Sequence, residues 1–198
     1  MSSAHSKAIT NQASEEQDFH LLENAFWQFS LDLYVKPEVA NYCLALQDQH
    51  NMQVNLLLYS IWLSAEGCIL EPQLIKQNSQ LQNWLSEIIP SIRLARKNVG
   101  ENSKQDPLYK QLKACELKAE QKAQAILYAI KRTYISELTL IEQKNHGDVK
   151  ALLEFNLSLC WQAFSDCGEK KPEPKLIKEF SQWMIMDSER KIEGKFKH

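Results

Sequence analysis

Polar side chains interrupt the most apolar and aromatic stretch of the chain, residues 26–62, and these side chains are the first candidates for chemistry. At about 100° per residue, His50 ends a helical stripe that also contains Val39, Cys43 and Leu46. Histidine titrates near neutral pH and serves as an acid, a base or a metal ligand. The other residues expected to converge with it, where three helices meet, are Ser30, Tyr34, Gln47, Asp48, Asn55 and Trp62. Together with His50 they are called the predicted polar cluster.

A structural role for the same residues is the alternative, and the sequence favours it. A histidine at a helix C-terminus stabilises the helix dipole and bonds the last carbonyl groups. A buried asparagine such as Asn55 commonly holds a neighbouring backbone segment. We therefore predict no catalytic residue within the cluster.

Metal and cofactor chemistry has little support in the sequence. Glu16 and His20 stand four residues apart, as do Glu142 and His146, and two such pairs could supply a carboxylate-bridged di-metal site. However, the first pair begins in a polar N-terminal segment and the second ends at a turn. The chain has no glycine-rich phosphate loop, no nucleophile-elbow pattern and no His-Glu-x-x-His sequence. We predict no metal and no cofactor.

The elements that must position these side chains are predicted to be helices. Glycine and proline are scarce, at five and six residues, while leucine, alanine, glutamine, glutamate and lysine are plentiful. The chain is therefore predicted to be an all-α, single-domain bundle of about six to seven helices. Residues 1–17 are expected to be disordered, residues 18–187 to form the helical domain, and residues 188–198 to form a flexible basic tail.

Three regions are expected within the helical domain. Residues 18–67 form a three-helix apolar core, in which a first helix begins near Asp18, a second runs from Pro37 to His50, and a third ends at Gly67. Residues 148–187 form C-terminal helices, the last from Leu176 to Met186. The core stripe of the third helix is predicted to contain Val54, Leu57, Leu58, Ile61 and Ala65.

Residues 72–142 are expected to form a long antiparallel helical hairpin with coiled-coil-like packing. Pro90 should kink its first arm, because proline removes one helical hydrogen bond. The predicted stripe of the first arm is Leu74, Asn78, Leu81, Leu85, Ile88, Ile92, Ala95 and Val99. That of the second arm is Leu112, Cys115, Ala119, Ala123, Ile126 and Ile130.

Charge is unevenly distributed along the chain, although the net charge is only −2. Residues 21–90 contain seven acidic residues and two lysines, whereas residues 91–135 contain ten basic and four acidic residues. Such asymmetry most often marks only a solvated face, and the alternative is self-association or a charged partner. A nucleic-acid partner is disfavoured, because no aromatic residues alternate with the basic ones to stack on bases.

The five cysteines form no Cys-x-x-Cys pair, and Cys43, Cys115 and Cys160 fall on predicted apolar helix faces. The N-terminal residues lack the apolar stretch of a signal peptide, and no run of apolar residues approaches a membrane span. These features predict a cytoplasmic location and no membrane association.

The apolar core resembles a known family. The residues that carry the likeness are Phe26-Trp-x-Phe-Ser30-Leu-x-Leu-Tyr34, then Cys43-Leu-x-Leu-Gln47-Asp48-x-His50, then Val54-Asn55-Leu-Leu-Leu58 and Trp62. They are similar to a family of small helical gammaproteobacterial proteins described as a domain of unknown function. Gln53 stands where the family is expected to carry an acidic residue. The resemblance implies a bacterial cytoplasmic helical protein and supplies no activity.

Two functions remain open from the sequence. The first is a non-enzymatic interaction or adaptor protein, whose surface is the hairpin, the C-terminal helix, or both. The second is a small-molecule-binding protein or enzyme, with a pocket around Asp48, His50 and Asn55 where the first three helices meet.

Overall fold

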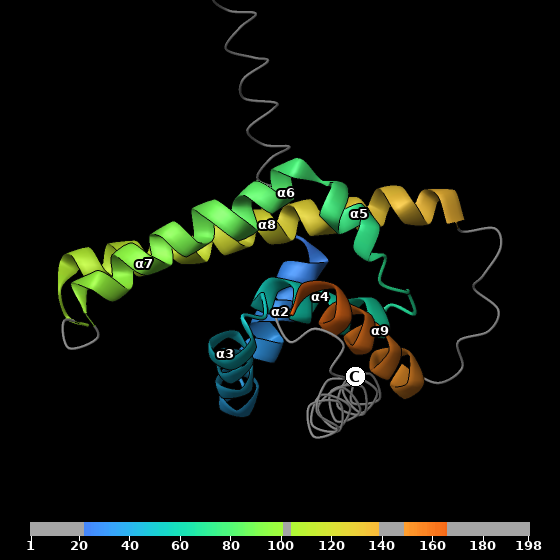
Figure 1. Ribbon diagram of the computed structural model, residues 1–198, viewed down its shortest axis with the longest axis horizontal. Helices are drawn as coiled ribbons and strands as arrows, with labels where there is room; N and C mark the ends of the chain where they lie inside the picture. Colours follow the sequence, from blue (N-terminus) through green and yellow to red (C-terminus); the bar gives the residue numbers. More distant parts are fainter. Residues whose placement is uncertain (1–21, 101–103, 139–148, 166–198) are drawn as a thin grey trace, which may run out of the picture. The chain divides into compact units, whose positions relative to one another are not determined.

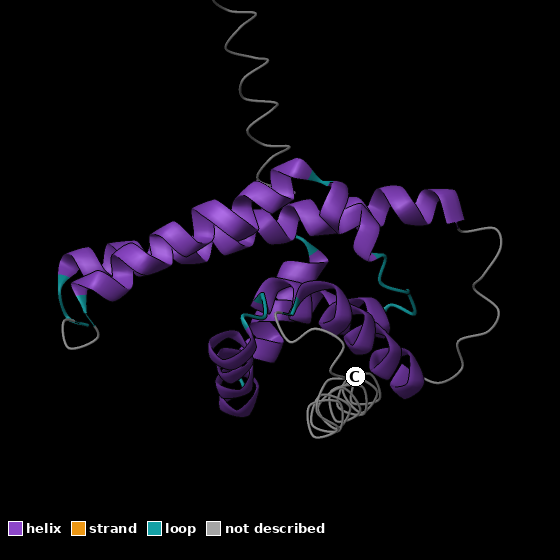
Figure 2. Ribbon diagram, viewed as in Figure 1, coloured by secondary structure: helices purple, strands orange, loops and turns teal. Residues whose placement is uncertain are grey.

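The computed structural model describes residues 22–100, 104–138 and 149–165, with side chains described as far as residue 133 in the second range. Within these ranges every regular element is a helix and none is a strand (Figure 2), so the all-α prediction is confirmed. No described helix is long and apolar enough to cross a membrane.

Several predictions fall outside the described residues. They concern the segment 1–17, the helix Leu176–Met186, the tail 188–198, and the paired residues Glu16, His20, Glu142 and His146.

The chain divides into two compact units. The first comprises Met1–Leu31 and Ile75–Ser136, and the second comprises Asp32–Leu74 and Glu137–His198. Each unit is thus built from two separate stretches of sequence.

Helix α2, Ala25–Tyr34, begins later than predicted. The Asn24 side chain caps it, because its Oδ1 accepts a hydrogen bond of 2.9 Å from the Trp27 backbone N–H. Residues 23 and 24 are not helical, so a continuous helix from Asp18 is wrong. Trp27 is buried, at 7% exposed, as expected for a helix that is apolar on two sides.

In the second unit, helices α3, Pro37–His50, and α4, Val54–Ala65, match the predicted positions. Pro37 opens α3, and Asn51 ends it in the left-handed region, at φ 52°. Gly67, at φ 71°, ends α4: its N–H donates to the Ser64 carbonyl, and the next N–H, from Cys68, donates to the Leu63 carbonyl. This pair of bonds is a Schellman motif, which glycine permits because it has no Cβ.

Helix α4 is buried on all sides rather than along one stripe. Every residue from Asn55 to Ser64 is buried, whereas Ala65, predicted to be in the core, is exposed. Helix α9, Val149–Phe164, packs against α4, and α3 also contacts α4. The small residues Ser60 and Ser64 are fully buried in α4 and occupy little volume, which favours close packing of another helix.

The first unit contains most of the hairpin. Its first arm is broken into α5, Pro72–Gln77, which crosses the boundary between the units, α6, Ser79–Asn83, the π-helix η1, Trp84–Ile88, and α7, Ile89–Val99. Asn78 was predicted to lie on the apolar stripe, but it caps α6, where its Oδ1 accepts from the Leu81 N–H at 2.8 Å. Ala95, also predicted to be on the stripe, is exposed.

The predicted disturbance at Pro90 takes the form of the π-helical turn just before it. Pro90 has no N–H, and its ring would crowd the carbonyl group four residues earlier in a regular helix. In η1 the Ile89 N–H instead bonds the Trp84 carbonyl, five residues earlier. The helical path therefore continues through Pro90 into α7.

The second arm is helix α8, Pro107–Leu138, and it runs antiparallel to α7 (Figure 1). Arg96 bonds Tyr109 and Glu116, whereas the earlier Arg93 also reaches the later Glu120, which is the order that antiparallel helices produce. The buried face of α8 differs from the prediction, because Cys115 is exposed and Glu116 is buried.

Thiol reactivity should report this packing. Burial raises the pKa of Cys43 and of Cys160 to about 12, so little reactive thiolate is present at ordinary pH. In a Cys167→Ser background, we expect Cys115 to react first with a thiol reagent. Cys43 and Cys160 should react only after urea unfolds the protein, as read by mass spectrometry of the labelled peptides. Fast labelling of Cys43 without urea would contradict the packing of α3.

Candidate functional site

The predicted polar cluster is spread across burial classes and across both units. Ser30 is buried in the first unit. In the second unit Asn55 and Trp62 are buried and Asp48 is exposed. The half-buried members there are Tyr34, Gln47 and His50. A site built from this set stays a prediction.

His50 is the last residue of α3, as predicted, and its ring packs against an aromatic side chain of α9. The His50 and Trp161 ring centroids are 4.9 Å apart, with the ring planes at 63°. This edge-to-face contact is typical of stabilising aromatic packing. A structural role for His50 at the α3–α9 contact is consistent with it.

Asn156 is the polar residue of the second unit with the most complete set of described bonds, and the sequence had not marked it as a candidate. It is fully buried in α9. Its Nδ2 donates to Ser64 Oγ at 2.9 Å and to the Cys68 carbonyl at 2.8 Å. Its Oδ1 accepts from the Leu70 N–H at 2.8 Å. One side chain thus joins α9 to the end of α4 and to the segment that follows it.

A sequence signal for Asn156 did exist. It lies on an apolar stripe of α9 with Leu152, Leu153 and Cys160, all of them buried. An amide on such a stripe must find internal partners, because an unbonded buried polar group is costly. The partners themselves are not visible in the sequence.

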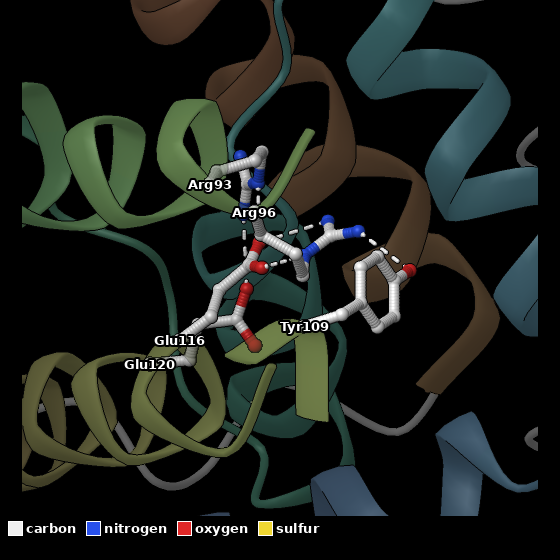
Figure 3. A network of polar contacts seen from close by, with 5 residues as sticks. All are labelled: Arg93, Arg96, Tyr109, Glu116 and Glu120. Atoms are coloured by element: carbon white, nitrogen blue, oxygen red, sulfur yellow. Dashed lines mark hydrogen bonds and ion pairs between the residues drawn. The ribbon is translucent and has the colours of Figure 1, made fainter. Parts of the chain in front are cut away.

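A second polar network lies within the hairpin of the first unit (Figure 3). Arg93 Nε donates to Glu116 Oε1 at 2.7 Å, and Arg93 Nη2 donates to Glu120 Oε1 at 3.0 Å. Arg96 Nε donates to Glu116 Oε2 at 2.5 Å. Glu116 therefore accepts from both guanidinium groups at once, and we call these four residues with Tyr109 the hairpin network.

Tyr109 closes the hairpin network near the start of α8. Its hydroxyl oxygen accepts from Arg96 Nη1 at 3.2 Å, and the Arg96 guanidinium carbon lies 5.8 Å from the centre of its ring. The guanidinium is thus held by a carboxylate and by an aromatic ring, an arrangement that favours arginine over lysine.

The surroundings shift the pKa values of the two carboxyl groups of the network in opposite directions. Burial alone would raise the pKa of Glu116, but hydrogen bonds from Arg96 and Arg93 outweigh it and hold that pKa below its ordinary value. Burial raises the pKa of Glu120, and the adjacent Glu116 charge adds to this, while Arg93 offsets only part of it. The hydrogen bond to Glu116 in turn raises the pKa of Arg96.

This arrangement clamps α7 to α8. The guanidinium donors point at internal carboxylates, so their charge is neutralised inside the hairpin rather than presented to an anionic ligand. Helical periodicity did not predict the clamp, because it placed Cys115 on the inner stripe, one residue away from Glu116. A charged residue three positions before Ala119, on the same helical face, was the available signal.

Replacing Glu116 by glutamine should lower the free energy of unfolding by about 1–3 kcal/mol at neutral pH, since two arginines lose a charged acceptor that is partly screened by solvent. The folded-state pKa lies below the ordinary 4.5, so this stabilisation is present above pH 4.5 and disappears as the pH falls through the folded value. The difference between the variant and the wild type should therefore shrink in acid, as measured by urea denaturation across the pH range.

Glu120→Gln is the matched control for that experiment. Because the pKa of Glu120 is raised, its ionised form is disfavoured in the folded state, and the sign of its pH dependence is opposite. The Glu120 variant should cost less stability at neutral pH than the Glu116 variant. Equal losses would show that the two carboxyl groups are not distinguished by the packing.

Metal binding has no visible basis in the described part of the chain, where no group of three or more histidine, cysteine, aspartate or glutamate side chains is gathered for an ion.

Comparison with known proteins places the chain in a family but not in a functional class. Residues 25–127 match a family described as protein of unknown function (DUF2390). The matched region spans α2 to most of α8 and includes the hairpin network, whereas α9 and Asn156 lie beyond it. No curated protein and no solved structure matches the chain. Because the match covers more than half of its length, the chain belongs to the DUF2390 family of proteins of unknown function.

Proposed function

We propose that this protein is a non-enzymatic interaction or adaptor protein of the bacterial cytoplasm, and that it binds an acidic protein partner through one face of α8. The observation that carries the proposal is that the arginines of the hairpin are paired internally, whereas several of its lysines are exposed. Arg93 and Arg96 are neutralised internally by Glu116 and Glu120. The lysines of α8 are not part of this network, and Lys110, Lys113 and Lys118 are exposed.

The proposed surface, called the lysine face, consists of Lys110, Lys113 and Leu117. These residues recur at the three- and four-residue spacing that lines one side of a helix. Both lysines are exposed, and Leu117 is 50% exposed. Lys110 Nζ donates to Gln105 Oε1 at 2.9 Å, a bond to a neutral amide that leaves its charge in place.

A protein partner fits this surface better than a nucleic acid. An exposed leucine bordered by polar side chains matches the apolar centre and polar rim of a protein interface. The lysine face carries no exposed aromatic side chain on which a base could stack. The net charge of −2 also lowers the general attraction to phosphate backbones.

The proposal can be tested by affinity capture from the source organism. The baits are the full chain, a Lys110→Glu/Lys113→Glu variant, and a Lys104→Glu/Lys118→Glu control with the same change of charge. Proteins that support the proposal, an untagged copy of this chain included, bind the wild type and the control, fail to bind the lysine-face variant and elute with salt. If all three baits retain the same proteins, the lysine face is not the docking surface.

Small-molecule binding at Asp48, His50 and Asn55 is the alternative function. His50 is half-buried, so it is not fully enclosed by the fold. A structural His50 predicts that His50→Gln lowers stability by about 1 kcal/mol and leaves function intact. A functional His50 predicts a stable variant that fails to complement a deletion strain. Thermal denaturation and complementation, measured side by side, separate the two roles, and we expect the first.

A further inference from the structure

This chain itself carries a surface with the features expected of the acidic partner of the lysine face. Helix α3 carries an outward stripe of Asn41, Leu44 and Asp48, with the same residue spacing as Lys110, Lys113 and Leu117 on α8. All three residues are exposed, with Leu44 45% exposed. Each stripe therefore joins an exposed leucine to a charge, negative on α3 and positive on α8.

Resting on the proposed function, we propose that the partner is a second copy of this chain, whose α3 packs against α8 of the first copy. The spacing of the charges selects the direction of packing. Asp48 lies four residues after Leu44, and Lys113 lies four residues before Leu117, which is about 6 Å along each helix. When the two leucines meet, an antiparallel alignment places Asp48 beside Lys113, whereas a parallel alignment separates them.

The same alignment gives Lys110 a partner. Lys110 lies seven residues before Leu117, and the corresponding position on α3, seven residues after Leu44, is Asn51 at the C-terminus of the helix. The last carbonyl groups of a helix carry partial negative charge and favour a nearby cation. A contact between α3 and α8 thus has the two leucines at its centre. Two favourable charge interactions, those of Lys113 and Lys110, lie on the same side of it.

The surrounding charges reinforce the choice of a second copy. In the described part of the second unit, acidic residues outnumber basic ones. The hairpin of the first unit has the opposite balance. Two copies can therefore attract each other through different surfaces, as in a heterologous contact.

The test is sedimentation velocity of the purified full chain at concentrations up to about 1 mM. We expect self-association that weakens as salt shortens the Debye length from about 10 Å at 0.1 M to about 3 Å at 1 M. Lys113→Glu and Asp48→Lys should each raise the dissociation constant at least about tenfold. Lys118→Glu, an equal charge change on another side of α8, should leave it nearly unchanged.

Mixing the two reversed variants gives the decisive result. Lys113→Glu puts an acidic residue at both facing positions, 48 and 113, and Asp48→Lys puts a basic residue at both. Mixed contacts therefore regain opposite charges at these two positions, while contacts between identical variants do not. We expect the mixture to associate more tightly than either variant alone. Circular dichroism spectra identical to the wild type show that the variants are folded.

A wild type that stays monomeric throughout, or a mixture no tighter than its components, would overturn the inference. Capture of another acidic protein through the lysine face would still support the proposed function in that case, so the two failures can be told apart. Leu44→Ala is a second probe. Leu44 is already 45% exposed, so its loss should weaken association without unfolding the chain.

Discussion

Trp62→Ala should lower the free energy of unfolding by about 3–5 kcal/mol, the largest effect expected from a single substitution in this protein. Trp62 is 2% exposed, and it lies in α4, which is buried around its whole circumference. Its ring also packs beside Tyr59, with centroids 6.0 Å apart. Removing the indole therefore leaves a cavity that the surrounding side chains fill only by moving.

The measurement is urea denaturation followed by circular dichroism, with the slope of the transition compared between variants. Leu94→Ala on α7 is the control, because Leu94 is 60% exposed and its truncation should change stability by no more than about 0.5 kcal/mol. Trp62→Phe should lie between the control and the alanine variant. An unchanged midpoint for Trp62→Ala would show that α4 is not the centre of its unit.

Asn156→Ala is expected to cost about 3 kcal/mol, although it removes no large apolar group. The Leu70 N–H and the Cys68 carbonyl would each lose a bond of 2.8 Å, and Ser64 would lose its contact with the amide. An unsatisfied buried backbone group costs about 1–3 kcal/mol, which is more than the average value of a bond. The loss should appear in the same denaturation experiment.

Asn156→Asp tests the bonding pattern itself. The aspartate retains an acceptor for the Leu70 N–H, but when ionised it has no donor for the Cys68 carbonyl or for Ser64. The variant should be less stable than Asn156→Ala at neutral pH and should recover as acid protonates the carboxyl group, because an unpaired buried charge is disfavoured. Gln162→Ala, at an exposed position of α9, is the control. Stability of Asn156→Asp that does not rise in acid would contradict the proposed bonds.

The sequence by itself determined the helical class and several helix boundaries, because these depend on neighbours within a few residues. Pro37 begins α3 since its ring suits a first turn, and Gly67 ends α4 since it enters the left-handed region without strain. The burial of Trp27 and Trp62 was also predictable, because helices that are apolar on more than one side are central.

Only the tertiary structure decided which polar residues are buried and form hydrogen bonds in the interior. Asn156 bonds Leu70, 86 residues away, and Arg93 bonds Glu116 across the hairpin, so neither pairing leaves a local pattern. Helical periodicity places residues on faces, but it does not distinguish Cys115 outside from Glu116 inside, one position apart on α8. That choice depends on the hydrogen bonds available from α7, because a carboxylate is stable in the interior only where cationic donors meet it.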